Sequence, residues 1–494
     1  NDIMKIIRNI ALLLSLVVLL MGCEPLPSNY VTVVADSSVT CTYDAHTFDL
    51  RYNIKPSIDG TMETIGRYTT AEDSWVESVD CTEEGILHIQ VAANAGTGRS
   101  TTITLSGDNF RSVSIKVNQM AAPTAVVDRT LIFHFFGTSL NRYFNTNIED
   151  ATQAISEGAL GTNNRVVCII QSSKSEGSIF ELCYNPSDSS VIKRHISDYT
   201  LSGSLVTPTE LSEIIAKAAN AAPANSYAMV FAGHGTAWIP RSSMTSGAST
   251  LSAGINPWTP APGAEVTRTF GETNIMLDIS ELAEGIELSG VELEYILFDA
   301  CFMANIETIY DLRNVAHYII ASPCEIMGRG FPYHRTLHHL FGDNFDLTSA
   351  AESYYLYYRD EYNGAARCGS VALFNCAEIE ALKDATHEIM LTATNDYDRK
   401  ALQTYEGQSI HYFYDFGEWV NAIATDETAL ATFNEQLNRV VVAKFTLPTF
   451  YSAFGSYGTY NINEDVYSGV TTSGPSDAFP YEWRECNWYN ATKP

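Results

Sequence analysis

Two residues with reactive side chains each follow a short apolar stretch of the chain. One stretch, residues 227–232, runs directly into Gly-His-Gly, and another, residues 293–298, runs directly into Asp-Ala-Cys. A thiol peptidase needs a thiolate nucleophile and a neighbouring imidazole that takes the thiol proton and later returns it to the leaving amine. His234 and Cys301 supply these two groups if their strands are neighbours. The sequence therefore predicts thiol hydrolysis.

The backbone around this pair supplies the other groups that acyl transfer requires. The N–H groups of Gly235 and Cys301 are the predicted oxyanion hole, because both follow the ends of strands. Glycine on each side of His234 permits a sharp turn and a close approach of substrate. A helical segment is predicted at 305–312. A helix start near Phe302 or Met303 is expected to lower the thiol pKa through the helix dipole.

Each of these residues has a simpler interpretation when it is taken alone. A lone cysteine at the end of a strand usually packs in the core, and a lone histidine usually makes a structural hydrogen bond. The joint pattern of a strand with Gly-His-Gly and a strand with Asp-Ala-Cys and a following helix is much rarer. The pair therefore favours chemistry over packing.

Alternating strands and helices surround the two motifs. Near-continuous apolar stretches at 131–136, 165–171 and 317–322 predict strands that are buried on both faces. Residues 207–210, Thr-Pro-Thr-Glu, form a capping box that opens an amphipathic helix. This alternation predicts a mostly parallel sheet covered by helices on both faces. Sites in such sheets lie at the carboxyl ends of the strands.

The N-terminus has the features of a targeting segment. Met4, Lys5 and Arg8 precede an apolar stretch that stops at Gly22-Cys23, which predicts a signal peptide over residues 1–22. The stretch is too short for a stable membrane span. The residues Leu-Met-Gly-Cys at 20–23 resemble a bacterial lipobox, which implies that Cys23 is lipidated. We therefore expect a lipoprotein held on the membranes of the bacterial cell envelope, with a plain secretory signal as the alternative.

Residues 30 to 120 alternate apolar and polar side chains with a period of two, which predicts an all-β sandwich. The residues at 74–76, 89–94 and 113–119 resemble the BACON domain, an immunoglobulin-like module of bacterial surface proteins. That resemblance implies a spacer, or a contact with carbohydrate or mucin. A small-residue linker at 121–125 ends this region. The expected domains are a signal peptide at 1–22, a lipid-anchored sandwich at 23–122, a peptidase core at 123–345 and a C-terminal extension at 346–494.

Composition argues against other classes of protein. Lysine and arginine number 29 against 58 aspartate and glutamate residues, so the formal net charge is -29. Nucleic-acid binding is not expected, because phosphate contacts need a basic surface. The cysteines have no zinc-site spacing, and Cys41 with Cys81 is one disulfide among several that the spacing permits. His334, His338 and His339 lack the thiol or carboxylate spacing of a metal site.

The two motifs carry a specific resemblance. Residues 230–235, Val-Phe-Ala-Gly-His-Gly, and residues 297–307, Leu-Phe-Asp-Ala-Cys-Phe-Met-Ala-Asn-Ile-Glu, resemble the clostripain family of cysteine peptidases, in the clan of caspases and gingipains. The resemblance implies a caspase-like α/β/α sandwich, a dyad of Cys301 and His234, and endopeptidase cleavage of peptide or protein substrates through a thioester. Members often favour arginine or lysine before the cleaved bond, and Asp299 matches the aspartate beside the nucleophile. Some members need calcium; this sequence has no recognisable calcium loop, so no cofactor is expected.

Residues 321–333 resemble the family loop that follows the next strand. Glu325 is a candidate second carboxylate for substrate binding, with a solvent-facing or structural role as the alternative. Met327 and Arg329 stand where acidic pocket residues are expected, which argues against a basic preference.

The long segment at 236–274 separates the two motifs and is rich in Ser, Gly, Thr and Pro, which predicts a surface loop. Some family members are activated by self-cleavage between the histidine and the cysteine. Arg241 and Arg268 are the basic residues of this loop.

Two other functions remain open from the sequence. The β-sandwich and the lipid anchor fit a non-catalytic surface adhesin or glycan-binding lipoprotein. The same thioester chemistry also permits transpeptidation.

Overall fold

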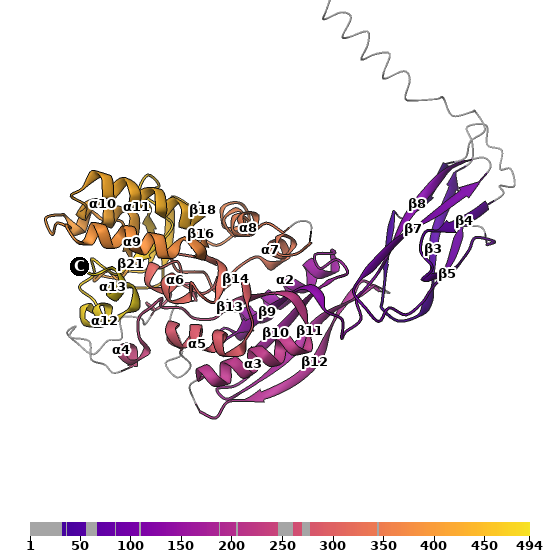
Figure 1. The fold of residues 1–494 in the computed structure, drawn as a ribbon, viewed down its shortest axis with the longest axis horizontal. Helices are drawn as coiled ribbons and strands as arrows, with labels where there is room; N and C mark the ends of the chain where they lie inside the picture. Colours follow the sequence, from indigo (N-terminus) through magenta and orange to yellow (C-terminus); the bar gives the residue numbers. More distant parts are fainter. Residues whose placement is uncertain are drawn as a thin grey trace, which may run out of the picture. The chain divides into compact units, whose positions relative to one another are not determined.

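The computed structural model describes residues 32–35, 37–55, 67–83, 85–107, 110–186, 188–203, 206–245, 260–268, 277–342 and 345–494. The chain divides into two compact units, Asn1–Ala122 and Pro123–Pro494 (Figure 1). The predicted signal peptide at 1–22 and the predicted lipidation site Cys23 lie outside the described residues. In the part of the chain that is described, no helix combines the length and the apolar character needed to cross a membrane.

The first unit is built from two four-stranded sheets. One has the order β1 (Thr32–Ala35), β3 (His46–Lys55), β6 (Ile86–Val91) and β5 (Val76–Asp80), and the other has the order β2 (Ser38–Cys41), β8 (Phe110–Gln119), β7 (Arg99–Gly107) and β4 (Arg67–Ala71). Leu50 and Ile89 from the first sheet share one buried cluster with Ile103 and Ile115 from the second. This arrangement is the sandwich that the period-two pattern predicts. Every cysteine of the described residues is a free thiol, so no disulfide joins the two candidates named above.

The second unit contains one large sheet. Its order is β12 (Ser190–Thr200), β11 (Glu176–Asn185), β10 (Asn164–Gln171), β9 (Val127–Phe135), β13 (Ala224–Ala232), β14 (Leu293–Asp299), β15 (Ala316–Ala321), β16 (Val371–Asn375) and β18 (Val441–Phe445). The central strands from β10 to β15 are parallel to one another. Two antiparallel strands extend the sheet at each edge.

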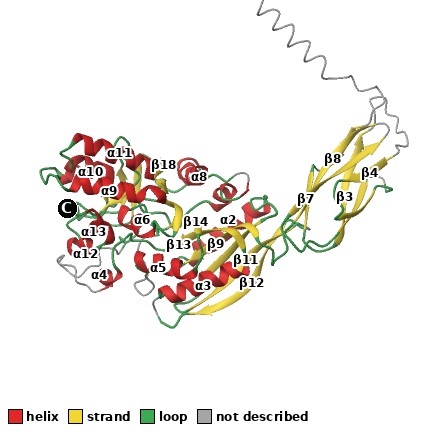
Figure 2. Cartoon of the chain, in the orientation of Figure 1, coloured by secondary structure: helices red, strands yellow, loops and turns green. Residues whose placement is uncertain are grey.

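Helices cover both faces of this sheet (Figure 2). Along β9, Leu131, Phe133 and Phe135 enter one buried cluster, whereas Ile132 enters the other. Residues of α2 (Asn141–Ser156) and α8 (Leu347–Asp360) pack into the first cluster. The second cluster contains residues of α3 (Pro208–Ala221), α5 (Ile279–Ser289), α6 (Ile306–Leu312) and α9 (Ile379–Met390). The predicted α/β/α sandwich is confirmed.

Two helix starts matter for the site. The capping box of α3 forms as predicted, since the Thr207 side chain accepts a hydrogen bond from the backbone of Glu210 at 3.2 Å and the Glu210 carboxylate accepts one from Thr207 at 3.0 Å. The helical segment predicted at 305–312 is confirmed as α6, which has Asn305 as its N-cap, whereas a helix start near Phe302 or Met303 is wrong. Phe302 has a φ of 62° and its N–H bonds to the carbonyl of Cys324 at 3.0 Å, so this turn is held by the neighbouring loop.

Residues 346–494, predicted as a C-terminal extension, contribute β16 and β18 to the large sheet. Their other helices are α10 (Phe416–Ile423), α11 (Glu427–Val440), α12 (Pro480–Glu485) and α13 (Asn487–Thr492). Their other strands pair as β17 (Tyr414–Asp415) with β21 (Thr471–Thr472), and as β19 (Thr449–Ser452) with β20 (Gly458–Asn461). Two further short helices of the unit are α4 (Arg241–Thr245) and α7 (Tyr333–Thr336).

Candidate active site

His234 and Cys301 follow two neighbouring parallel strands at the same edge of the large sheet. In the register of β13 and β14, Ala232 is paired with Asp299, and each candidate residue comes two positions later. A Cβ atom placed on Gly235 would lie 2.5 Å from the carbonyl oxygen of Cys301. Only glycine permits this approach, so the strand ends bring the two motifs into direct contact.

The thiol of Cys301 is held inside the protein. Its side chain is completely buried, and its Sγ accepts a hydrogen bond from the backbone N–H of Ile326 at 3.0 Å. Ile326 belongs to the loop that follows β15, the next strand of the sheet. The loop at the end of a third strand, β15, thus holds the sulfur in place.

The imidazole of His234 is half-buried, and Ser139 contacts it. The Oγ atom of Ser139 lies 2.7 Å from Nε2 of His234. Ser139 follows β9, the neighbour of β13 on the side away from β14. Sequence reasoning missed this serine, although the rule that strands of a parallel sheet end at one edge was sufficient to find it.

A segment of the long loop lies in the site. We call residues 260–268 the docked segment. Within it, the N–H of Arg268 bonds to the carbonyl of Ile326 at 2.7 Å, and the N–H of Gly328 bonds to the carbonyl of Val266 at 2.7 Å. Thr267 and Met327 form an antiparallel bridge between these bonds. The docked segment therefore binds the loop after β15 as an added strand, the way extended peptides bind exposed edges.

The last residue of the docked segment meets the predicted oxyanion donor. The N–H of Gly235 donates to the carbonyl oxygen of Arg268 at 3.1 Å. The carbonyl of Arg268 is thus already bound to one of the two predicted oxyanion-hole donors.

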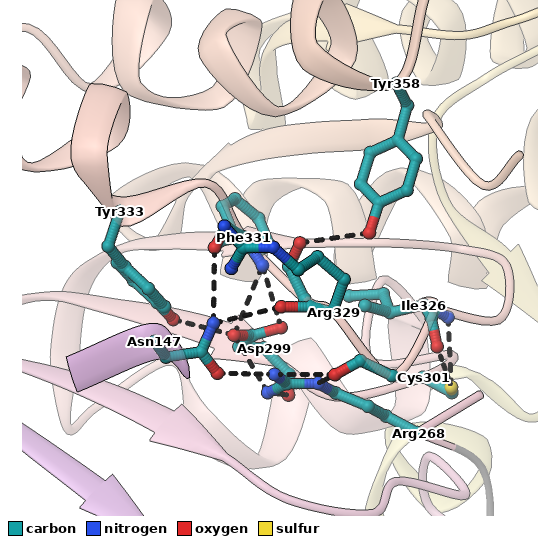
Figure 3. A network of polar contacts seen from close by, with 11 residues as sticks. Asn147, Arg268, Asp299, Cys301, Ile326, Arg329, Phe331, Tyr333 and Tyr358 are labelled. Carbon is teal, nitrogen blue, oxygen red and sulfur yellow. Dashed lines mark hydrogen bonds and ion pairs between the residues drawn. The ribbon is translucent and has the colours of Figure 1, made fainter. Parts of the chain in front are cut away.

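The side chain of Arg268 fills a polar pocket (Figure 3). Its Nη1 atom lies 2.8 Å from Oδ2 of Asp299, and both side chains are completely buried. Its Nη2 donates to Oδ1 of Asn147 at 2.6 Å and to the carbonyl of Gly328 at 3.2 Å. The ring of Phe144 lies 5.7 Å from the guanidinium carbon. We call this the arginine pocket; Asn147, on α2, is a member that sequence reasoning missed.

Other groups hold the Asp299 carboxylate in place. The hydroxyl of Tyr333 donates to Oδ2 at 2.8 Å, and the N–H of Phe331 donates at 3.3 Å. Burial raises the pKa of Asp299, and the guanidinium of Arg268 opposes this shift. Gly330 forms the wall, with a φ of 69° and no room for a side chain, since a Cβ atom would lie 2.6 Å from Oδ1 of Asp299.

Arg329 does not enter the arginine pocket. Its guanidinium pairs with Asp150 at 2.7 Å, and only its backbone carbonyl contacts the pocket, through Asn147 at 2.9 Å. Asp150 therefore balances the charge of Arg329, and this charge no longer argues against arginine or lysine before the cleaved bond.

Glu325 is placed differently from Asp299. Its carboxylate is completely buried, which excludes a solvent-facing role, and its Oε2 accepts a hydrogen bond from the Thr267 hydroxyl at 2.6 Å. It therefore lies beside the residue that precedes Arg268. Within the described ranges, no group of three His, Cys, Asp or Glu side chains is arranged to hold a metal ion.

Comparison with known proteins gives a family and several similar structures. Residues 137–444 match the family model described as Peptidase_C11, the clostripain family. The chain is similar to a secreted C11 cysteine protease from Bacteroides thetaiotaomicron, "iotapain", with 29% identity, a TM-score of 0.65, and coverage of 74% of this chain and 99% of that one. A search of curated proteins finds no match.

Two further solved structures are similar over the same extent. An inactive zymogen C11 protease from Parabacteroides distasonis is 25% identical with a TM-score of 0.61, covering 75% of this chain and 99% of that one. A secreted C11 protease from Bacteroides thetaiotaomicron in complex with an irreversible peptide inhibitor is 23% identical with a TM-score of 0.61, covering 74% and 98%. At that identity the second likeness concerns the fold alone.

Proposed function

The chain belongs to the clostripain family of cysteine peptidases, and on that premise we propose that it is an exported endopeptidase that cleaves after arginine or lysine. The observation that supports this preference is Arg268, whose side chain is buried on Asp299 while its carbonyl accepts a hydrogen bond from Gly235. The docked segment thus has the contacts expected of a substrate with arginine before the cleaved bond.

In the proposed reaction, the thiolate of Cys301 attacks the carbonyl carbon of the residue in the arginine pocket. His234 takes the thiol proton and returns it to the leaving amine, which leaves a thioester on the sulfur. The N–H groups of Gly235 and Cys301 stabilise the negative oxygen that forms during the attack. Water then hydrolyses the thioester with His234 as the base.

The shape of the arginine pocket favours arginine over lysine. A guanidinium carries donors in a planar fork, and four acceptors meet it here: the carboxylate and the backbone carbonyl of Asp299, the Asn147 side chain and the Gly328 carbonyl. An ammonium group is a point charge on a shorter arm and leaves part of this acceptor set unpaired. We expect lysine substrates to be cleaved more slowly.

We also propose that the docked segment keeps the uncleaved chain inactive. Its arginine fills the arginine pocket and its Arg268 carbonyl takes up the N–H of Gly235, so a substrate has no access until the bond after Arg268 is cut. Arg241, the other basic residue of the described loop, pairs instead with Glu281 at 2.8 Å. A similar structure is described as an inactive zymogen, which is consistent with this proposal.

The proposal is tested with the purified full chain and peptides that carry arginine before a fluorogenic leaving group. Cys301→Ala should abolish hydrolysis, and a peptidyl-arginine electrophile should label the wild-type chain but not this variant. Cys183→Ala, in a half-buried cysteine of β11, is the matched control and should keep wild-type activity. Wild-type activity in Cys301→Ala would overturn the proposed nucleophile.

Export and lipid anchoring at Cys23 form the second part of the proposal. It rests on the lipobox-like residues at 20–23 and on similarity to a protease described as secreted. We propose that the β-sandwich is a spacer between the anchor and the peptidase, with contact to carbohydrate or mucin as its other candidate role. Radiolabelled palmitate should enter the chain in a bacterial host and be lost in Cys23→Ala but not in Cys81→Ala. Equal labelling of both variants would exclude Cys23 as the anchor.

A further inference from the structure

The docked segment makes a second buried polar contact, one residue before Arg268. Thr267 is only 6% exposed, and its hydroxyl donates to Oε2 of Glu325 at 2.6 Å. Glu325 itself is 0% exposed. A completely buried carboxylate is costly unless donors surround it, so the partners of Glu325 define what this position accepts.

Two other donors come from the end of β19 and the residue after it. The Ser452 hydroxyl donates to Oε1 of Glu325 at 2.6 Å, and the N–H of Ala453 lies 3.1 Å from Oε1 and 3.2 Å from Oε2. These donors belong to the framework of the protein and stay when the docked segment leaves. The shorter of the two hydrogen bonds to Oε2, in contrast, comes from Thr267 of the docked segment.

The backbone fixes which residue of a bound peptide reaches Glu325. Arg268 and Val266 form hydrogen bonds with Ile326 and Gly328, and Thr267 lies between them opposite Met327. Glu325 directly precedes Ile326, so its carboxylate is tied to the same strand that positions the arginine. Any peptide bound in this register presents its penultimate side chain, the one before arginine, to Oε2.

We propose that Glu325, supported by Ser452 and Ala453, is a specificity-determining residue that selects threonine or serine immediately before the arginine of the cleaved sequence. This inference rests on the proposed function and adds a second requirement to it. The preferred substrates are therefore proteins with exposed Thr-Arg or Ser-Arg pairs, and the Thr267-Arg268 pair of the chain is one of them.

The chemistry separates threonine from its closest isostere. Valine has the same shape, but it offers no donor and leaves a buried carboxylate oxygen without its strongest partner. A site built to bind a hydroxyl rejects the analogue that lacks it, because the unpaired polar group stays buried. The almost complete burial of Thr267 also limits the space to a side chain of about this size, which disfavours lysine and arginine.

The test compares peptides that differ only in the residue before arginine, with the wild-type full chain after it has cleaved itself. We expect kcat/KM for Val-Arg to be about tenfold to hundredfold lower than for Thr-Arg, with Ser-Arg close to Thr-Arg. Equal rates for threonine and valine before arginine, or a preference for lysine at that same position, would overturn the inference while leaving cleavage after arginine intact. If no arginine peptide is cleaved, both the inference and the proposed function fail.

Variants of the chain give a second measurement. Glu325→Gln should reduce the Thr-Arg to Val-Arg ratio by about tenfold, whereas Glu181→Gln, in a buried carboxylate of β11, should leave the ratio unchanged. Self-cleavage of the uncleaved chain is the internal counterpart: Thr267→Ser should process near the wild-type rate and Thr267→Val about tenfold more slowly. Unchanged processing of Thr267→Val would contradict the proposed selection.

Discussion

The guanidinium of Arg268 lies 2.8 Å from the carboxylate of Asp299, and neither side chain is exposed to solvent. Removal of one partner of such a buried ion pair strongly destabilises the folded protein, because the other charge stays buried without compensation. The pair therefore ties the docked segment to the arginine pocket.

Replacement of this arginine should block self-cleavage. Arg268→Ala removes the side chain that holds the segment in the register for attack, so we expect the chain to stay intact on a gel over times at which the wild type is fully cut. Arg268→Lys should cleave slowly, because it keeps the charge. Arg241→Ala, a second loop arginine with its own ion pair, should process like the wild type. Efficient cutting of Arg268→Ala at the same bond would contradict this assignment.

The charge of Asp299 should appear in the pH dependence of specificity. Burial raises the pKa of this carboxyl, so it binds a proton at a higher pH than an exposed aspartate does. The protonated form has no charge to offer a guanidinium. The ratio of kcat/KM for arginine to that for citrulline should therefore fall as the pH drops through this pKa and be highest above it.

Citrulline has nearly the shape of arginine without its charge, so the titration of the catalytic pair cancels in this ratio. Asp299→Asn should make the ratio low and independent of pH. A wild-type ratio that stays constant across the acid range would show that another group recognises the guanidinium.

Gly330 offers a test of the shape of the arginine pocket. Gly330→Ala places a Cβ atom 2.6 Å from Oδ1 of Asp299 and adopts a left-handed conformation that costs about 1–2 kcal/mol. We expect it to abolish cleavage after arginine. Gly290→Ala is the matched control, because Gly290 has the same φ of 69° and nothing within 4 Å of the added atom. Gly290→Ala should lose only the stability that the left-handed backbone costs, and Gly330→Ala should lose more, because its Cβ also meets Arg268 and Asp299. At a temperature where both variants are folded, only Gly330→Ala should lose activity.

The framework of the site was predictable because it depends on local patterns. The apolar stretches that end at His234 and Cys301 are central parallel strands, and central strands are buried on both faces. The hairpin of β11 and β12 was missed, since β12 is the edge strand of the sheet and carries exposed polar residues such as Lys193 and His195. Edge strands lack the continuous apolar signal.

The contacts that complete the site could not be predicted in the same way. Arg268 reaches Asn147 across 121 residues of sequence, and Glu325 meets Ser452 across 127. No spacing rule connects a long polar loop with one helix and one distant strand. The turn at Phe302 that separates Cys301 from α6 was missed for a related reason, because it is held by hydrogen bonds to a loop about twenty residues later.

Ser139 should act as a positioning residue for the imidazole. Its hydroxyl lies 2.7 Å from Nε2 of His234, and a contact of this length restrains the orientation of the ring. A hydrogen bond of this kind is worth about 1 kcal/mol, so Ser139→Ala should lower kcat about fivefold and leave KM near its wild-type value. Ser139→Thr keeps the hydroxyl and should recover most of the rate, while Ser156→Ala, at the end of α2, should change neither constant. A rise in KM with unchanged kcat would show instead that Ser139 serves substrate binding.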